Sequence, residues 1–268
     1  MILLEDCSVG LRKLEKESVD LVVTSPPYDD LRSYNESSRW SFEKFKEIAK
    51  ALTQALKEGG VIVWNTADQV VNGSETGNSF RQALYFMDEC GLRLHDTMIW
   101  QKPNFSNPSK TRYHQVFDYV FILSKGAPKT FNPIIDRPNV YSGKVGSYGT
   151  NTVTQRDGSK KVRERTVNKE FGMRHNVWLM KTAGQDQSSK KWKHPAMFTE
   201  EFARDHILSW SNPDDMVIDP FAGSGTTAVV ALRTGRRFLG FEIDETYWNL
   251  AIQRIQDQGS NNDTTSTN

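Results

Sequence analysis

Runs of hydrophobic residues divide the first part of the chain into alternating strands and helices. A continuous apolar, β-branched run at 18–24 predicts a buried strand, which ends at two prolines. From Ser41 onwards the apolar residues recur at helical spacing. They predict a helix that begins with Ser41 as its N-cap and stops at Gly59 and Gly60. The apolar run at 61–65 predicts the next strand.

The same alternation continues through the rest of the chain, apart from one irregular stretch. We expect strands at 94–100, 116–124, 216–221 and 237–243, and helices at about 79–90, 195–210, 224–235 and 245–257. Strands that alternate with helices are typical of α/β proteins with a doubly wound, mostly parallel sheet. We therefore predict that fold class.

The irregular stretch, residues 127–191, differs from the rest in both pattern and charge. It shows no clear period, and a stretch of this length inside a compact domain is usually functional or mobile. The slightly longer segment 125–193 contains 15 Lys and Arg against five Asp and Glu, a net charge of +10 in a chain whose total is +1. A basic segment on an otherwise acidic protein suggests contact with a polyanion. A solvated surface insertion is the alternative, and charge alone does not separate the two.

Composition excludes several classes of protein. A length of 268 residues fits one large α/β domain, or one domain with a sizeable insertion. Cys7 and Cys90 are far apart, which excludes a disulfide framework and a structural zinc site. His114, His175 and His194 are isolated and predict no metal site. No apolar run approaches 18 residues and the N-terminus does not resemble a signal peptide, so we expect a cytoplasmic protein without a membrane partner.

A glycine-rich turn, "DPFAGSGTT" (219–227), connects a predicted strand to a predicted helix. Gly223 and Gly225 let the backbone turn tightly and approach a ligand, because they carry no Cβ. Glu242 follows Asp219 by 23 positions, a spacing that suits an acid binding a ribose diol. No lysine follows the second glycine as in a phosphate-binding loop, and an acid at Asp219 suits a cationic ligand better than a pyrophosphate. S-adenosylmethionine (SAM) carries an ammonium, a sulfonium and a ribose; the alternative is a plain strand–helix turn.

A proline turn, "TSPPY" (24–28), ends the first predicted strand. The prolines make it stiff, and it lies at the carboxyl end of a strand, where open α/β sheets bind ligands. The Ser25 hydroxyl and the carbonyls of Ser25 and Pro26 are hydrogen-bond acceptors, and Tyr28 adds an aromatic face. Such a turn suits an extruded cytosine or adenine, since acceptors for both amino hydrogens localise the nitrogen lone pair beside a sulfonium methyl. A rigid surface turn is the alternative.

Together, the two motifs resemble those of the SAM-dependent DNA amino-methyltransferases, which methylate cytosine N4 or adenine N6. Their order, with the proline motif first, is similar to that of the permuted β class. The resemblance covers nearly the whole chain and implies a Rossmann-like methyltransferase fold with one catalytic domain. In that domain, residues 1–126 would form a catalytic half, 127–191 a target-recognition insertion, 192–258 a SAM-binding half and 259–268 a disordered tail.

The resemblance also implies roles for individual residues. The catalytic motif would comprise Ser25, Pro26, Pro27 and Tyr28. The expected SAM-binding residues are Asp219, Phe221, Gly223, Gly225 and Thr226 at the glycine turn, Glu242 at the ribose, Asp6 at the adenine, and His194 in a segment that closes over the methionine part. In the basic segment, charge alternates over 158–165 with little apolar content, and we expect phosphate contacts from Lys160, Lys161, Arg163 and Arg165. A mobile solvated loop is the alternative there.

The resemblance favours cytosine N4 as the methyl acceptor. Serine at the first position of the proline motif is commoner in enzymes of that kind, whereas Asp or Asn is commoner in adenine N6 enzymes. Adenine N6 stays the alternative, because a serine hydroxyl accepts a hydrogen bond from either amine. The expected partner is double-stranded DNA, with a cognate restriction enzyme as a further candidate, and the expected state is a monomer or a homodimer.

The sequence also bears on three other functions. A cytosine C5 enzyme is excluded because neither cysteine stands beside a proline turn. Methylation of an RNA or protein amine is a more distant alternative, because the proline motif binds a planar amine and not a particular polymer. A DNA-binding module without catalysis is the third, and the intact Ser25, Tyr28, Asp219 and Glu242 argue against it.

Overall fold

A computed structural model describes the chain from Met1 to Asn262, apart from residues 28–39, 106–107, 144–151, 163–166 and 187–197. The chain divides into two compact units. The larger combines Met1–Asn132 with Asn176–Asn268, and the smaller is Pro133–His175. Each unit is described by itself below.

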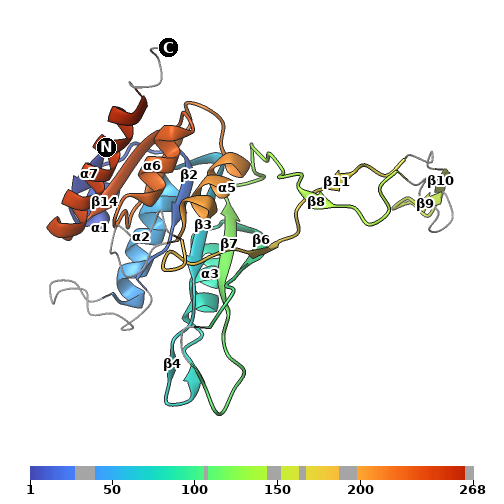
Figure 1. The fold of residues 1–268 in the computed structure, drawn as a ribbon, viewed down its shortest axis with the longest axis horizontal. Helices are drawn as coiled ribbons and strands as arrows, with labels where there is room; N and C mark the ends of the chain where they lie inside the picture. Colours follow the sequence, from blue (N-terminus) through green and yellow to red (C-terminus); the bar gives the residue numbers. More distant parts are fainter. Residues whose placement is uncertain (28–39, 106–107, 144–151, 163–166, 187–197, 263–268) are drawn as a thin grey trace. The chain divides into compact units, whose positions relative to one another are not determined.

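The larger unit is built on an eight-stranded sheet (Figure 1). In spatial order the strands are β1 (Ile2–Leu4), β14 (Arg237–Glu242), β13 (Met216–Asp219), β2 (Val19–Thr24), β3 (Leu56–Thr66), β7 (Phe117–Ser124), β6 (Arg93–Gln101) and β12 (Val177–Leu179). Strand β7 is antiparallel to both of its neighbours, and the other pairs are parallel. The predicted doubly wound, mostly parallel sheet is confirmed.

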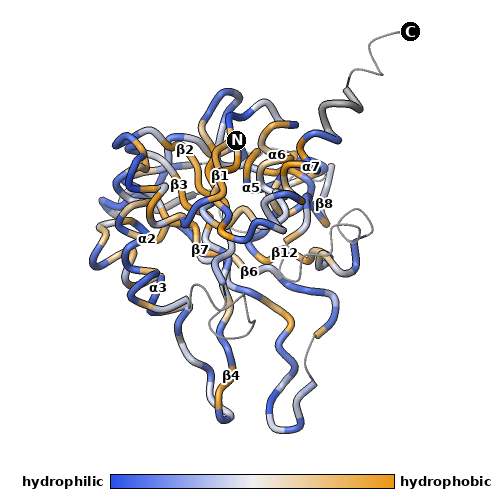
Figure 2. Tube along the Cα trace, turned by 90° about the vertical axis from the view of Figure 1, so that its left-hand side faces the viewer, coloured by the Kyte–Doolittle hydropathy of each residue, from blue (hydrophilic) through white to orange (hydrophobic). Residues whose placement is uncertain are grey.

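Helices cover both faces of this sheet. They are α1 (Cys7–Leu11), α2 (Phe42–Ala55), α3 (Asn78–Asp88), α5 (Glu200–Trp210), α6 (Thr226–Arg233) and α7 (Glu245–Asn262). The chain passes from β2 through α2 to β3 in one direction, and from β13 through α6 to β14 in the other. Because such crossovers are right-handed, α2 and α6 lie on opposite faces. The sheet is therefore buried between two helical layers, and hydrophobic residues follow its strands (Figure 2).

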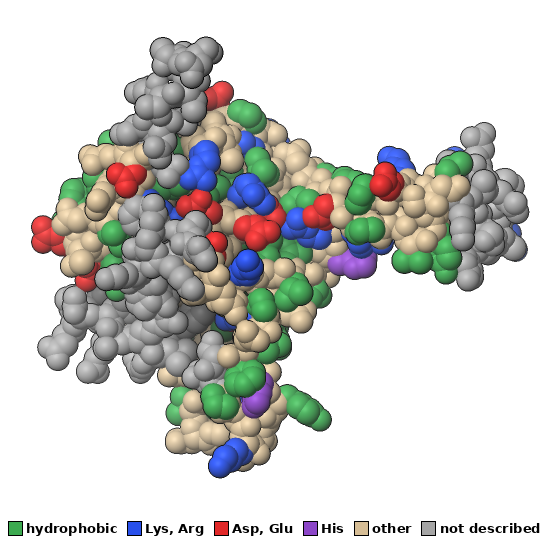
Figure 3. Space-filling view, viewed as in Figure 1, with side chains coloured by type: hydrophobic (Ala, Val, Ile, Leu, Met, Phe, Trp, Pro, Cys, Tyr) green, Lys and Arg blue, Asp and Glu red, His purple; other side chains and the backbone are tan. Residues whose placement is uncertain are grey.

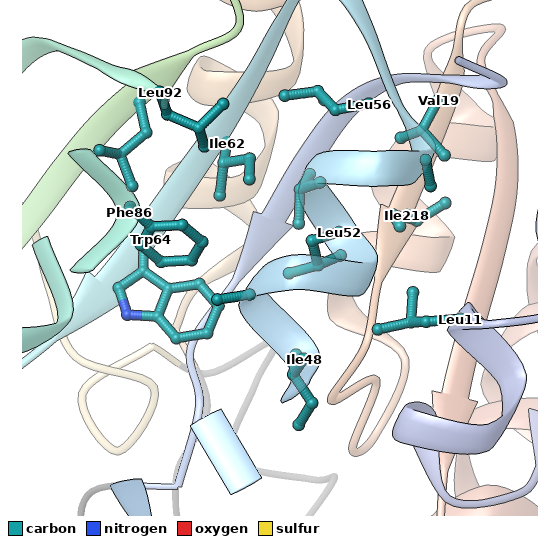
Figure 4. Close-up of a cluster of buried hydrophobic side chains, with 14 of the residues drawn as sticks. Leu11, Val19, Ile48, Leu52, Leu56, Ile62, Trp64, Phe86, Leu92 and Ile218 are labelled. Atoms are coloured by element: carbon teal, nitrogen blue, oxygen red, sulfur yellow. The ribbon is translucent and has the colours of Figure 1, made fainter. Parts of the chain in front are cut away.

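A core of buried apolar side chains holds α1, α2 and α3 against one face of the sheet (Figure 4). Ile48 and Leu52 of α2 belong to the same buried cluster as Trp64 of β3. Trp64 is fully buried, and its indole Nε1 donates a hydrogen bond of 2.8 Å to the Gln82 side chain on α3. Large aliphatic and aromatic residues at helical spacing thus fix the position of the strands that carry the site.

The predicted end of α2 was wrong. The helix stops at Ala55, and β3 begins at the next residue, ahead of Gly59 and Gly60. Gly59 has a φ of +77° within the strand, and a Cβ there would stand 2.7 Å from Cβ of Lys129. Glycine is therefore required by a left-handed turn of the backbone and a close neighbour inside β3, and not by the end of a helix.

Other boundaries also differ from the prediction. The helix predicted at 195–210 begins at Glu200, and the strand predicted at 216–221 ends at Asp219. Helix α7 continues to Asn262, so the first four residues of the predicted disordered tail are helical. The sequence patterns also missed β1, α1 and β12, which are too short to show a period.

The smaller unit consists of two antiparallel ribbons. In one, β8 (Arg137–Pro138) pairs with β11 (Phe171–Gly172); in the other, β9 (Thr152–Thr154) pairs with β10 (Lys160–Val162). An ion pair between Arg174 and Asp136 holds its two ends together. The unit falls within residues 127–191, the predicted insertion, whereas β12 of the same range belongs to the main sheet.

Across the described residues, no helix has both the length and the apolar character needed to cross a bilayer.

Candidate active site

The two sequence motifs leave the sheet side by side. Strands β2 and β13 are parallel neighbours, with Leu21 opposite Val217 and Val22 opposite Ile218. The proline turn follows β2 and the glycine turn follows β13, so both begin at the same edge, which we call the carboxyl edge. The crossovers leave these two strands in opposite directions. This is the topological switch point at which doubly wound sheets bind ligands.

The Asp219 carboxylate joins the two turns. Its Oδ1 accepts hydrogen bonds from Thr24 Oγ1 (2.6 Å) and the Phe221 amide (3.0 Å), and its Oδ2 accepts one from Thr227 Oγ1 (2.7 Å). Asp219 is 3% exposed. Burial raises its pKa to about 6, against the lowering effect of the hydrogen bonds. The carboxylate is thus bound within the protein, which favours positioning the turns over the direct contact with a cation that the sequence suggested.

The glycine turn needs glycine at both expected positions. Gly223 and Gly225 have φ of +51° and +78°, values that residues with a side chain rarely adopt. A Cβ on Gly225 would also stand 3.0 Å from Cβ of Ala251 on α7. Thr226 follows as the first residue of α6. The backbone of the turn is therefore not covered by side chains at these two positions. It leads directly into the first turn of α6, where amide groups have no partner within the helix.

Glu242, at the end of β14, lies against the glycine turn as its spacing predicted. Its Oε2 accepts a hydrogen bond of 2.8 Å from the Gly223 amide. Its Oε1 accepts from the amides of Ile243 (3.0 Å) and Asp244 (2.9 Å). Burial raises the pKa of Glu242, although these hydrogen bonds oppose the change. The arrangement holds a carboxylate at a fixed place beside the turn.

Asp6 reaches the same edge through β1. Leu4 pairs with Glu242 across β1 and β14, so the chain that follows β1 emerges beside the glycine turn. Asp6 caps α1 through a 2.8 Å hydrogen bond from the Ser8 amide, and its Oδ2 forms a 3.0 Å ion pair with Lys44 of α2. Burial tends to raise the pKa of Asp6, but the bonds from Lys44 and Ser8 hold it below its ordinary value. Three acids far apart in sequence thus lie at one edge.

The proline turn presents Ser25 at the end of β2. Pro26 is buried, and Ser25 and Pro27 are half-buried. Asn65, at the end of β3 and 1% exposed, donates a hydrogen bond of 3.3 Å to Ser25 Oγ. The sequence reasoning missed Asn65. It could have been found, because it is a polar residue at the end of an apolar run that was predicted to be a strand. Tyr28 lies outside the described residues.

Aromatic rings surround Phe221 in the glycine turn. It meets Trp40 edge to face at a centroid distance of 5.4 Å and Trp64 at 6.4 Å. Phe221 was expected to contact SAM. In the structure its ring lies at the boundary between the turn and the core, and so it also anchors the turn.

A buried arginine on α7 donates hydrogen bonds to the glycine turn. Arg254 of α7 donates to the Ser224 carbonyl (3.2 Å), to Thr226 Oγ1 (2.9 Å) and to Glu200 Oε1 (2.7 Å). The residue has no exposed surface, and burial lowers its pKa while Glu200 raises it. Glu200 also pairs with Arg233 at 2.8 Å. Sequence reasoning missed Arg254, because the burial of its helix face against the turn is seen only in the structure.

The remaining candidates belong to the smaller unit or fall outside the described residues. Lys160 and Lys161 are exposed residues of β10 in the smaller unit. Arg163, Arg165 and His194 lie outside the described residues. Within the part of the chain that is described, no three His, Cys, Asp or Glu side chains gather in a way that could hold a metal ion.

Known proteins resemble this chain in sequence and in fold. A family model for N6/N4 methyltransferases, described as a DNA methylase, matches residues 19–253. "Orphan methyltransferase M.BamHII" of Bacillus amyloliquefaciens is 50% identical over 244 residues, which cover 89% of each chain. Among solved structures, "PvuII DNA methyltransferase (cytosine-N4-specific)" aligns with a TM-score of 0.66 at 21% identity, over 96% of this chain and 90% of that one. The "M1.HpyAVI-SAM complex" aligns with a TM-score of 0.60 at 22% identity, over 95% and 98%. These two structures share the fold.

Proposed function

The chain belongs to the N6/N4 DNA methylase family, and from this premise we propose that it transfers a methyl group from SAM to the exocyclic amino group of a flipped base in double-stranded DNA. Cytosine N4 is the favoured acceptor and adenine N6 the alternative. The observation that carries the proposal is the contact between the two turns, in which Asp219 binds Thr24 of one and Thr227 of the other. This contact supports the proposal because it would hold a site for a methyl donor next to a site for an amine.

The residues at the glycine turn fit SAM. Gly223 and Gly225 leave the backbone open to close approach, and Glu242 supplies a fixed carboxylate for a ribose hydroxyl. A carboxylate offers about four acceptor positions, and the structure shows three backbone amides on Glu242, so it has capacity for a hydroxyl. Asp6 lies beyond Glu242 at the same edge, on the side expected for the adenine. When bound, SAM supplies an electrophilic methyl group.

The proline turn suits the base. The Ser25 hydroxyl and the adjoining carbonyls are acceptors for the two amino hydrogens, and accepting both localises the nitrogen lone pair. The hydrogen bond from Asn65 fixes the position of Ser25 Oγ, so this acceptor is in place before the base enters. Tyr28 would stack on the ring. Such preorganisation lowers the barrier because the groups need not reorganise during transfer.

The choice of cytosine N4 depends on Ser25, since serine at this position is typical of N4-cytosine enzymes. Adenine N6 requires the same acceptors and the same geometry. Residues 127–191 are proposed to recognise the target sequence, and Lys160 and Lys161 to contact its phosphates. A cognate restriction enzyme and a monomeric or homodimeric state stay predictions.

The test is methylation of unmethylated plasmid DNA with SAM, followed by digestion to nucleosides and mass spectrometry. N4-methylcytosine is the expected product. N6-methyladenine would preserve the reaction and overturn the choice of base. Transfer of label from SAM to RNA or protein, with none to DNA, would overturn the proposed substrate. Ser25→Ala is the matched control, and it should lose product while it retains SAM binding.

A further inference from the structure

Two loops project from the carboxyl edge beyond the proposed site. Residues 102–116 join β6 to β7, and residues 67–77 follow β3 and contain the ribbon of β4 (Val70–Val71) and β5 (Ser74–Glu75). Strands β3 and β6 are both antiparallel to β7, so they end at the same edge as β2. We call residues 67–77 and 102–116 the projecting loops. They extend away from the sheet together (Figure 1).

The projecting loops are held in place by side chains. Arg112 donates to the Gly73 carbonyl (2.5 Å) and to Glu75 Oε1 (3.3 Å), which ties one loop to the other. At the root, Lys102 forms a 2.6 Å ion pair with Asp118 of β7. Asp68 accepts a 3.0 Å hydrogen bond from the Ser79 amide, which anchors the second loop to α3. Among the described residues, Arg112 is therefore held against the ribbon of β4 and β5, and both loops are anchored at their roots.

The chemistry at the tips suits a nucleic acid. Residues 102–116 contain Lys102, Lys110 and Arg112 and no acidic residue. Lys102 and Arg112 are paired with acids from elsewhere, whereas Lys110 is exposed, and no ion pair to it occurs among the described residues. Tyr113 is 99% exposed. Hydrophobic side chains and a histidine lie at this end of the molecule, with a basic side chain below them (Figure 3). Lys110 and Tyr113 are exposed and lie three positions apart in the same loop, and a cation and an aromatic ring suit a phosphate and a base.

We propose that Lys110 and Tyr113 of the projecting loops contact the DNA duplex beside the flipped base. The inference rests on the proposed function, because a base that enters the proline turn must bring its flanking duplex to the carboxyl edge. Lys110 binds a backbone phosphate, and Tyr113 packs on a base or sugar. These contacts are additional to those predicted for Lys160 and Lys161 in the smaller unit.

The test for Lys110 is the salt dependence of duplex binding. Lys110→Ala should lower the slope of log affinity against log salt by about one, the value expected for one lost phosphate contact. The matched control is Lys16→Ala. Lys16 is also exposed, but it precedes β2 and so lies at the opposite edge of the sheet, and its removal should leave the slope unchanged. SAM affinity should be unaltered in both variants.

The test for Tyr113 separates a base contact from a phosphate contact. Tyr113→Ala should weaken duplex binding by about 10-fold or more at constant salt slope, while Tyr113→Phe keeps near-normal binding. If the protein methylates DNA but Lys110→Ala and Tyr113→Ala both keep the wild-type salt slope and affinity, this inference is overturned while the proposed function stands. A wild-type protein that neither binds nor methylates DNA would instead overturn the proposed function.

Discussion

Replacing Asp219 by Asn tests whether a buried carboxylate joins the two turns. The side chain keeps its shape but loses its charge. Burial raises the pKa of Asp219 from an ordinary 3.8 to about 6. A difference of about two units corresponds to about 3 kcal/mol at about 1.4 kcal/mol per unit. The folded state holds the proton of Asp219 more tightly than the unfolded state does. Ionising the buried carboxyl therefore destabilises the fold: the loss is absent below about pH 4, where the group is protonated in both states, and complete above about pH 6. Wild-type stability therefore loses about 3 kcal/mol to this group as pH rises through that window.

The assay is urea unfolding of the wild type and Asp219→Asn at several pH values from 4 to 7. The difference between them isolates this group, since carboxylates such as Asp6 and Glu200, whose pKa values are lowered, affect both proteins alike. The variant should gain about 3 kcal/mol relative to the wild type between pH 4 and pH 7. A difference in unfolding free energy that stays constant with pH would show that Asp219 does not have a raised pKa in the folded protein.

Ligand binding by the same variants separates positioning from direct contact. Asp219→Ala leaves Thr24 and Thr227 without their shared acceptor and should abolish SAM binding, because the glycine turn loses its support. Asp219→Asn retains an acceptor and should keep most of the affinity. Equal losses in the Asn and Ala variants would instead indicate that the charge binds the ligand directly.

Three further changes follow from the same account. Tyr28→Ala should reduce methyl transfer about 100-fold and SAM affinity little, in steady-state and calorimetric assays; equal losses would argue against stacking on the base. Arg254→Met should destabilise the fold by about 3 kcal/mol and weaken SAM binding, whereas Arg254→Lys should keep part of the stability and part of the SAM affinity. A stable Met variant with normal SAM affinity would show that Arg254 does not support the turn. Reversing charge at Lys160 and Lys161 should weaken duplex binding and flatten its salt dependence, and a wild-type slope would exclude both from the interface.

The sequence was sufficient to predict which turns form the site, but not the side-chain contacts that hold these turns together. The proline and glycine turns each end an apolar run, and parallel strands of a doubly wound sheet all end at one edge, so the position of both turns at that edge was predictable, whereas the pairing of β2 with β13 was not. The bond from Thr24 to Asp219 was not, because it joins residues 195 positions apart whose register depends on the folded sheet. Arg254 was missed for the same reason, since its partners come from two other helices and a turn.

Short elements escaped prediction for another reason. Strand β1 has three residues, too few for a period, and it is held by pairing with β14, which also places Asp6 beside Glu242. Gly59 and Gly60 looked like the end of a helix, but the close approach of Lys129 explains the first of them. In both cases the local structure depends on a residue that is distant in sequence and close in the fold, which a local sequence pattern does not reveal.

A crystal structure with an unreactive SAM analogue would show whether the two turns form one site. We expect the analogue to lie along the glycine turn, with its ribose at Glu242 and its methyl-donor position facing Ser25. An analogue bound away from Gly223 and Gly225, or with that position turned from the proline turn, would contradict this expectation.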